Sequence, residues 1–326
     1  MTTLIDTRVV PAPDRSEYWA EGIAQHFFPI RVESVSADSF DARLTGGQVG
    51  PVAVRSITGL PHRVGRTLPM IASSDPECII LYLVRDGLCR IAQDETSSLL
   101  LPGDIAIQDS SRPSVFEATT GFDVLVLSYP KWLIGPRAGA IARRGGTRMA
   151  GREAAFARLV TPFVAKLACA ADGGGVAGPE GDGAAEMLIT MLRTLYGDSG
   201  PVPTPAEDLL TRMRGYVAAH LHDPDLGPEQ LARAHYVSTR YVHKLFAPTG
   251  VGVSAWIRRQ RLDGARVELQ TTRDARVAEV AARWGYRDAA SFARAFREQF
   301  DCTPSDARAL GGAVVDAAEP VDQVNG

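Results

Sequence analysis

The feature that most constrains this chain is a repeat of about fifty residues near its C-terminus. The first copy, EQLARAHYVSTRYVHKLF, covers Glu229–Phe246, and the second, AEVAARWGYRDAASFARAF, covers Ala278–Phe296. The apolar positions correspond at an offset of 49 before the turn and 50 after it: Leu231-Ala232 with Val280-Ala281, Val242 with Phe292, and Phe246 with Phe296. One supersecondary unit is therefore used twice, and the second copy has one additional residue in its turn.

Each copy has the pattern of a helix, a tight turn and a second helix. In the first copy Pro228 after Gly227 suits a helix start, His235–Val237 forms the turn and Ser238 caps the next helix. In the second copy Gly285 permits the turn and Asp288 is the cap. Apolar residues recur at three- and four-residue spacings, which predicts one buried stripe per copy: Leu231, Ala232, Val242, Leu245 and Phe246, then Val277, Val280, Ala281, Trp284, Phe292, Phe296 and Phe300.

The second helix of each copy leaves a face outside this stripe. A recognition helix reads base edges in the major groove with its exposed N-terminal part, where cationic side chains bind guanine and Ala methyls contact thymine. A single copy is also compatible with an ordinary helical bundle, but two copies with the same inner pattern favour paired helix-turn-helix units. The residues expected to contact DNA are Thr239, Arg240, His243 and Lys244 in the first copy, and Ala289, Ala290, Ser291 and Arg294 in the second.

Charge is distributed unevenly along the 326 residues. Residues 226–308 hold thirteen Arg and one Lys against nine acidic residues, a surplus of five positive charges. Because the whole chain has a net charge of −3, the remainder carries −8. A basic segment on an acidic protein indicates a local nucleic-acid surface.

The chain before residue 130 has the pattern of short strands. Turn-forming pairs such as Asp86-Gly87 and Pro102-Gly103 separate its β-prone runs. Many short strands at close spacing predict a sandwich or barrel. The expected strands are Val52–Ile57, Ile79–Ile91, Ser97–Leu101, Asp104–Gln108, Ser114–Ala118 and Phe122–Tyr129, after a short helix over Asp14–Phe28.

Two helices and two connectors follow the strands. The helices Glu153–Ala171 and Ala184–Tyr196 carry apolar residues at helical spacing, and they either form a dimer interface or pack on the β domain. The connectors Asp172–Gly183 and Gly197–Pro205 are rich in Gly and Pro, which is typical of flexible segments.

The sequence has no pattern typical of an enzyme or a metal site. A G-x-S-x-G elbow, an H-E-x-x-H pair and a Walker loop are all absent. The N-terminal half holds only His26 and His62, which form no H-x-H pair. We therefore expect no catalysis, no cofactor and no metal. The four cysteines, Cys78, Cys89, Cys169 and Cys302, form no C-x-x-C motif and are interpreted as reduced thiols, with a Cys78–Cys89 redox pair as the alternative.

No apolar run is long enough to span a membrane, and the first residues lack the pattern of a secretory signal. We expect a cytoplasmic protein with no membrane partner.

The C-terminal pattern resembles the AraC/XylS family of bacterial transcription regulators. The match runs through nearly the whole of 226–308 and includes Leu231-Ala232, Ser238, Leu245-Phe246, Gly250, Trp256–Leu262, Ala265-Arg266, Val277–Ala281, Trp284–Tyr286, Ser291-Phe292, Phe296, Phe300, Thr303-Pro304 and Arg308. The resemblance implies two helix-turn-helix subdomains joined by a long helix, about Ser254–Gln270. It also implies that both recognition helices enter adjacent major-groove segments, with the eight residues named above as the reading positions.

Two positions depart from the expected pattern. Asp301 stands where the family usually has Gly, and we expect it to adopt the left-handed backbone conformation, which Asp tolerates better than most residues. Gly264 lies inside the central helix, where it is expected to cost up to about 1 kcal/mol relative to Ala.

The N-terminal half resembles the AraC-binding-like, cupin-type sensor domain over about residues 17–135. The likeness rests on Arg66-Thr67, Leu101–Asp104 and Asp109–Pro113. It implies a β-barrel that binds a small effector. Five residues are candidates for the lining of a pocket, although the pattern favours rim and packing positions for each: Arg63, Arg66, Tyr82, Arg85 and Tyr129.

Together these patterns predict an α+β protein: an N-terminal cupin-like jelly-roll barrel, a helical connector and an all-α domain with two helix-turn-helix subdomains. The expected divisions are a sensor domain at 1–137, a connector with a possible dimerisation role at 150–196, a linker at 197–206, the DNA-binding domain at 207–310 and a disordered tail at 311–326.

We expect a sequence-specific regulator, an activator by family resemblance, controlled by a small effector in the barrel. The alternative is a constitutive regulator whose barrel only dimerises or binds a protein. The expected partners are double-stranded operator DNA, RNA polymerase, the effector and a second copy of the chain.

Overall fold

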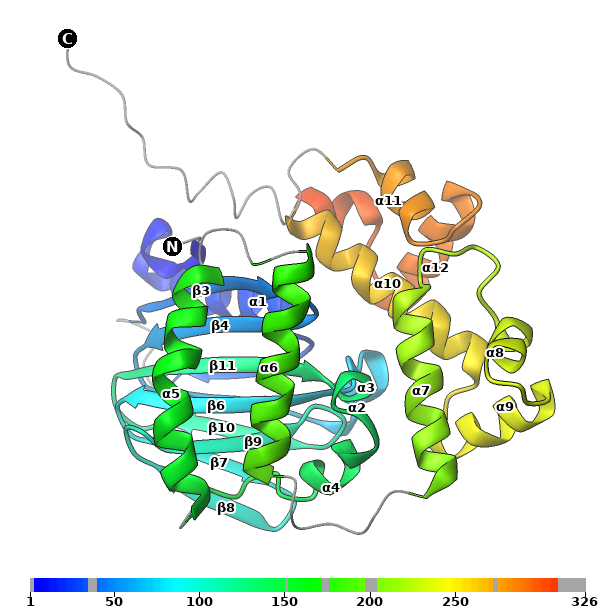
Figure 1. The fold of residues 1–326 in the computed structure, drawn as a ribbon. Helices are drawn as coiled ribbons and strands as arrows, with labels where there is room; N and C mark the ends of the chain where they lie inside the picture. The colour runs from blue at the N-terminus through cyan, green and yellow to red at the C-terminus, as the bar shows by residue number, and fades with distance from the viewer. Residues whose placement is uncertain are drawn as a thin grey trace. The chain divides into compact units, whose positions relative to one another are not determined.

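The computed structural model describes residues 3–34, 40–149, 152–171, 176, 178–196, 204–271 and 275–309. Contacts within the chain divide the described residues into two units, one within residues 3–196 and the other within residues 204–309. The described strands all belong to the first unit, and the described part of the second is helical (Figure 1). This arrangement confirms the expected α+β class. Residues 197–203 of the expected linker and the expected tail 311–326 lie outside the described residues.

The N-terminal unit contains two antiparallel sheets. The larger has the order β1 (Thr3–Asp6), β3 (Ala42–Val49), β4 (Val52–Gly59), β11 (Phe122–Pro130), β6 (Cys78–Asp86) and β9 (Ile105–Asp109). The smaller has the order β2 (Arg31–Ser34), β5 (His62–Arg66), β10 (Ser114–Ala118), β7 (Cys89–Gln93) and β8 (Thr96–Leu100). The turn at Gly87 divides the single strand expected over Ile79–Ile91 into β6 and β7.

The sheets are open, so the N-terminal domain is a two-sheet jelly roll and not the closed barrel that was expected. Two buried glutamines connect the sheets where a closed barrel would have a backbone ladder. From β7, the Gln93 side chain accepts from Asp109 N at 2.8 Å and donates to Asp109 O at 2.9 Å. From β9, Gln108 Nε2 donates to Ala92 O and Val115 O in the smaller sheet, at 3.1 and 2.8 Å. Side-chain amides thus replace backbone pairing across this gap.

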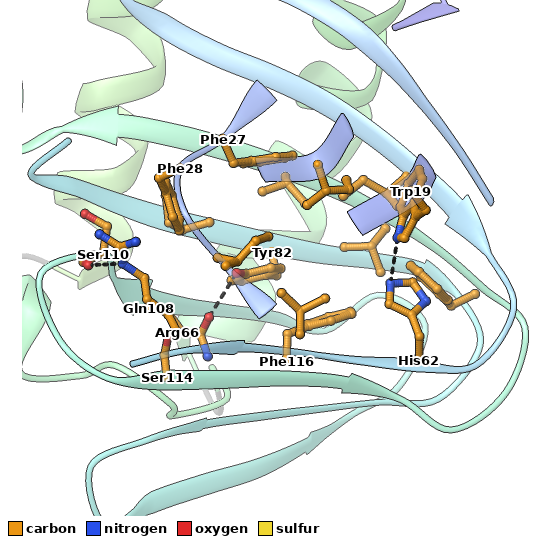
Figure 2. A pocket seen from close by; sticks show the side chains of 18 residues that line it. Trp19, Phe27, Phe28, His62, Arg66, Tyr82, Gln108, Ser110, Ser114 and Phe116 are labelled. Atoms are coloured by element: carbon orange, nitrogen blue, oxygen red, sulfur yellow. Dashed lines mark hydrogen bonds between the residues drawn. The ribbon is translucent and has the colours of Figure 1, made fainter. Parts of the chain in front are cut away.

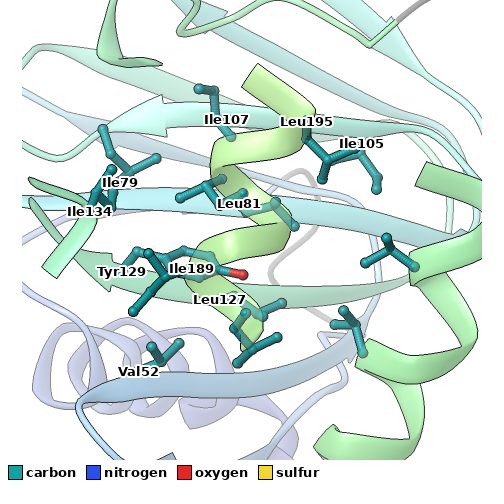
Figure 3. Close-up of a cluster of buried hydrophobic side chains, with 14 of the residues drawn as sticks. Val52, Ile79, Leu81, Ile105, Ile107, Leu127, Tyr129, Ile134, Ile189 and Leu195 are labelled. Carbon is teal, nitrogen blue, oxygen red and sulfur yellow. The ribbon is translucent and has the colours of Figure 1, made fainter. Parts of the chain in front are cut away.

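Strands β6 and β11 are buried on both faces. Successive side chains of a strand point to opposite sides, and each side of these two strands packs in a different hydrophobic cluster. Ile79, Leu81 and Leu83 of β6 belong to a hydrophobic cluster beneath two helices, whereas Ile80 and Val84 belong to a second cluster between the sheets. Figure 3 shows the first cluster, with Leu81, Leu127 and Tyr129 beside Ile189 and Leu195.

The helices of the first cluster are α5 (Arg152–Ala171) and α6 (Gly178–Tyr196), which lie across the larger sheet (Figure 1). They contribute Val160, Val164, Leu188 and Leu192 to the shared core. Both helices were expected. They pack on the β domain, which was one of the two roles considered for them, the other being a dimer interface. Their role in dimerisation stays a prediction.

Helix α6 begins at Gly178, inside the segment expected to be a flexible connector. Close packing explains the glycine there, because a Cβ on Gly181 would lie 2.0 Å from Val176 O. Val176 in turn bridges to the β3–β4 hairpin, donating from its N to Gln48 O at 2.8 Å. This glycine therefore allows a close approach rather than supplying flexibility.

Shorter helices complete the unit: α1 (Arg15–His26), which matches the expected leading helix, α2 (Leu68–Ser73), α3 (Lys131–Ile134) and α4 (Ala138–Ala142). All four cysteines are free thiols. Burial raises the pKa of the Cys89 thiol to about 12 and that of Cys78 well above its usual range, so both stay protonated.

The C-terminal unit consists of α7 (Pro205–Ala219), α8 (Pro228–Ala234), α9 (Thr239–Phe246), α10 (Val253–Thr271), α11 (Val277–Arg283) and α12 (Ala289–Phe300). Helix α10 is the central helix that was expected over about Ser254–Gln270, and it joins α8–α9 to α11–α12 (Figure 1). Across both units, none of the helices in the described ranges is long and apolar enough to cross a bilayer.

The glutamine bridge predicts that Gln93→Leu destabilises the N-terminal unit by about 1–3 kcal/mol, because Asp109 N–H then loses its partner in a buried position. Gln48→Leu is the matched control, since Gln48 is exposed on β3. Urea unfolding of both variants measures the difference. Equal free energies of unfolding for the two variants would contradict the bridging role.

Candidate DNA-binding surface and ligand pocket

The two helix-turn-helix units close with the same hydrogen bonds. Val237 N donates to Ala232 O at 3.0 Å in the first turn, and Tyr286 N donates to Ala281 O at 2.9 Å in the second. The next helix then begins two residues after Val237, at Thr239, but three residues after Tyr286, at Ala289. The additional residue of the second copy is therefore Arg287.

Both recognition helices, α9 and α12, begin at the caps expected from the sequence. Ser238 Oγ accepts from Tyr241 N at 3.2 Å, and Asp288 Oδ1 accepts from Ser291 N at 2.7 Å. The hydrogen bonds from Ser291, first of all from its backbone N–H, lower the pKa of Asp288 below its usual value and keep this cap ionised at neutral pH. At each helix start, the side chain of the cap residue thus accepts a hydrogen bond from a backbone N–H group that has no partner within the helix.

The apolar stripe of each copy is buried as expected. Leu231, Val242 and Phe246 lie in one core, and Val280, Phe292 and Phe296 lie in another. The recognition residues expected from the sequence lie on the opposite, outer faces: Arg240, His243, Lys244, Ala289, Ala290 and Arg294 are exposed, and Thr239 and Ser291 are partly exposed. Within the described ranges, no ion pair occupies Arg240, Lys244 or Arg294. The fold thus leaves three cationic groups open to a partner, although their contacts with DNA stay a prediction.

The two helix-turn-helix units are tied together through the loop between α7 and α8. Arg261 of α10 donates to Leu221 O at 2.9 Å and also to Asp223 O. The extra residue Arg287 forms an ion pair with Asp225 of the same loop. These contacts limit how far one unit can turn against the other.

Trp284 lies where the two helix-turn-helix units meet, a region called the joint below, and it packs against the cores of both units. Its Nε1–H donates to Glu268 Oε2 at 2.6 Å. A Cβ on Gly264 of α10 would lie 2.1 Å from the Trp284 ring. Gly264 was expected to be a weak point of the central helix, but the helix needs glycine here to admit the indole.

Tyr236 in the first turn is a residue that the sequence analysis did not single out. It corresponds to Gly285 of the second turn, and both have left-handed backbones, with φ of +55° and +72°. The Tyr236 side chain is 97% exposed. The sequence contained a signal for this conformation, because Tyr236 stands at the position where the second copy of the repeat has glycine. At the end of α12, Asp301 also has the expected left-handed backbone, with φ of +55°.

A cavity lies between the sheets of the N-terminal unit. Its volume is about 60 Å³, and its walls come from α1, from the segment after α1, and from β4, β5, β6, β9, β10 and β11. Figure 2 shows Trp19, Phe27, Phe28, Tyr82 and Phe116 arranged around it. Of the five candidates weighed from sequence, Arg66 and Tyr82 line the cavity.

The other three candidates do not line the cavity. Arg63 is exposed, Arg85 forms an ion pair with Asp123, and Tyr129 is buried in the core beneath α5 and α6. Sequence reasoning missed His62 and Val64 of the cavity wall because β5 was not predicted. Their signal is the alternation of His62, Val64 and Arg66 along one face of a strand. In the described part of the chain, no group of His, Cys, Asp or Glu side chains is arranged to hold a metal ion.

Comparison with known proteins gives matches in both units. Residues 231–309 match a helix-turn-helix domain family, and residues 19–195 match the AraC-binding-like domain family. The chain is 33% identical over 273 residues to the transcriptional activator NphR of Rhodococcus sp, covering 81% of this chain and 80% of NphR. It is 32% identical over 103 residues to the regulatory protein SoxS of Escherichia coli, covering 31% of this chain and 94% of SoxS.

Among solved structures, the fold is similar to that of the AraC-like transcriptional activator CuxR, with a TM-score of 0.53 and 23% identity over 81% of this chain and 94% of CuxR. Two helix-turn-helix units in one chain with an AraC-binding-like domain define a DNA-binding transcription regulator. The chain belongs to the AraC/XylS family.

The packing of Trp284 predicts that Gly264→Ala destabilises the C-terminal unit by about 1–3 kcal/mol, because the added methyl overpacks the joint. Helix propensity alone predicts the opposite sign, by about 1 kcal/mol. Gly183→Ala in α6 is the control, because open space surrounds Gly183 and the substitution there should stabilise. Thermal unfolding of both variants decides between packing and propensity, and a stabilised Gly264→Ala protein would refute the packing argument.

The left-handed backbone at Tyr236 predicts that Tyr236→Gly raises the stability of the C-terminal unit by about 1 kcal/mol, since glycine adopts this conformation without the steric cost of a Cβ. Tyr236→Ala should give no such gain, because it removes the ring and keeps the Cβ. Chemical unfolding of the two variants measures the difference. The same gain from Ala would mean that the exposed ring, and not the backbone, carries the cost.

Proposed function

We propose that this regulator binds operator DNA sequence-specifically through α9 and α12 and activates transcription under the control of a small molecule in the N-terminal cavity. The observation that carries the DNA-binding part is the presence of two recognition helices that have side-chain caps at equivalent positions, equivalent buried stripes and open outer faces. Relatedness to the activator NphR supports activation.

Each recognition helix supplies different chemistry to the DNA. Helix α9 offers Thr239, Arg240, His243 and Lys244, whose hydrogen-bond donors suit guanine and phosphate oxygens. Helix α12 begins with Ala289, Ala290 and Ser291, whose small side chains allow close approach to thymine methyls, and Arg294 follows one turn later. The first helix is therefore the more cationic reader and the second the closer-fitting one.

The other partners follow from this mode of action. Activation would require contact with RNA polymerase at the promoter, and the proposed binding of operator DNA supports a location in the cytoplasm. A homodimer is supported by apolar side chains exposed on the helices over the sheet: Leu159 of α5 is 76% exposed and Met187 of α6 is 49% exposed. Two copies would occupy paired or directly repeated half-sites.

A constitutive regulator, whose N-terminal unit only dimerises or binds a protein, is the second candidate. The cavity favours control by an effector, because an apolar cavity with a few polar groups is the usual form of a small-molecule site.

Binding of a base by Arg294 predicts that Arg294→Ala weakens specific operator binding by about 1–3 kcal/mol, or about 5- to 150-fold, with little change on random DNA. Arg31→Ala is the matched control, since Arg31 is an exposed arginine of the N-terminal unit. Mobility shifts on the upstream region of its own gene, with random competitor DNA and at two salt concentrations, measure both affinities. Equal losses on operator and random DNA would make Arg294 a phosphate contact instead.

A further inference from the structure

The N-terminal cavity has room for a single ring. A volume of about 60 Å³ holds about four to six water molecules, which corresponds to roughly 120–180 Å³ of liquid. A monocyclic molecule with one small substituent has this size, whereas a long acyl chain or a nucleotide does not fit within it.

The cavity walls suit an aromatic guest. Tyr82 and Phe116 stack with their ring centroids 5.3 Å apart, and Phe116 and Phe122 meet at 5.9 Å in a tilted arrangement. Trp19 contributes a further ring edge near His62 (Figure 2). Rings in such clusters favour stacked and edge-to-face contacts, which a flat guest satisfies better than a puckered one.

Most polar groups in the walls are already engaged. His62 Nε2 accepts from Trp19 Nε1 at 3.3 Å and its Nδ1–H donates to Leu60 O at 2.9 Å, while burial lowers the His62 pKa and keeps the ring neutral. Gln108 Nε2 donates to the carbonyl oxygens of Ala92 and Val115, which connects the two sheets. Its Oε1 accepts from the Tyr82 hydroxyl at 2.9 Å. These groups shape the cavity and leave little for a polyhydroxylated guest.

Arg66 is the cationic group in the lining, and backbone carbonyls hold it. Its guanidinium donates to Ser110 O at 2.6 Å, to Pro29 O at 2.7 Å and to Ser74 O at 2.6 Å. It also lies over the Phe28 ring, 4.4 Å from the centroid. A guest carboxylate would have to compete with these carbonyls for the arginine, and an uncharged guest avoids the cost of burying an ion.

Two hydroxyl groups retain hydrogen-bonding capacity. Tyr82 donates its proton to Gln108, so its oxygen still has a lone pair to offer. Within the described residues, the Ser114 hydroxyl has no hydrogen bond. We propose that the effector of this regulator is an uncharged, single-ring aromatic molecule whose one hydrogen-bonding group meets Tyr82 Oη and Ser114 Oγ. This inference rests on the proposed control by an effector.

Four probes of similar size test the class of ligand on the full chain: phenol, toluene, benzoate and glucose. Thermal unfolding and calorimetry are followed over increasing probe concentration, because a ligand of the folded state raises the unfolding midpoint. We expect phenol to bind, toluene to bind about 5- to 10-fold more weakly, and benzoate and glucose to give no shift. Equal or tighter binding of benzoate or glucose overturns the proposal.

Variants locate the binding in the cavity. Val64→Phe fills the space and should abolish phenol binding, whereas Val115→Phe, at the neighbouring position to Phe116 and outside the lining, should leave it unchanged. Tyr82→Phe should bring phenol down to the level of toluene. Ser114→Ala serves the same purpose if Tyr82→Phe disturbs Gln108, because the Ser114 hydroxyl supports no described contact. Phenol binding that survives Val64→Phe overturns the assignment.

Operator binding separates this inference from the function beneath it. Specific operator binding by a protein that binds none of the aromatic probes would overturn the ligand class and leave the DNA-binding proposal intact. Binding of the aromatic probes without any specific operator binding would overturn the DNA-binding proposal and leave the ligand class intact.

Discussion

The N-terminal unit depends on two strands, β6 and β11, that are buried on both faces. Val124 and Val126 of β11 border the cavity, while the intervening Leu125 and Leu127 pack in the core beneath α5 and α6. One layer of backbone therefore separates the cavity from the helices. Under the proposed effector control, a guest that displaced these strands would also displace the surface on which both helices rest.

The C-terminal unit depends on a comparable contact of its own. Trp284 fills a notch that Gly264 leaves in α10, and it packs against the cores of both helix-turn-helix units. Arg261 and Arg287 add polar contacts to the loop before α8. Two recognition helices held by one joint can act as a single reader, because their spacing is not free to vary independently of the fold.

Periodic, local signals made the C-terminal unit predictable from sequence. Its caps at Ser238 and Asp288, its turns and its buried stripes all depend on residues within a few positions of each other. The roles of Gly264 and Gly181 were misjudged because each is decided by a neighbour distant along the chain, Trp284 in one case and Val176 in the other.

The same limit explains the missed strands and the open sheets. Strand β3 contains Gly46 and Gly47, which weaken any strand pattern, and β5 is only five residues long. The glutamine bridges that stand in for a closed barrel join β7 to β9 through side chains, and no local pattern marks such a pairing. The cavity could not be located for this reason, since His62, Val64 and Arg66 of its wall come from β5, a strand that was not predicted.

The most direct measurement of the central claim is selection of binding sites for the full-length protein from random-sequence DNA. Two recognition helices held on one joint predict a bipartite site for each chain, with two short preferred blocks about one helical turn, or roughly 10 bp, apart. A single short block, or no preferred sequence at all, would contradict the account that α9 and α12 read DNA together.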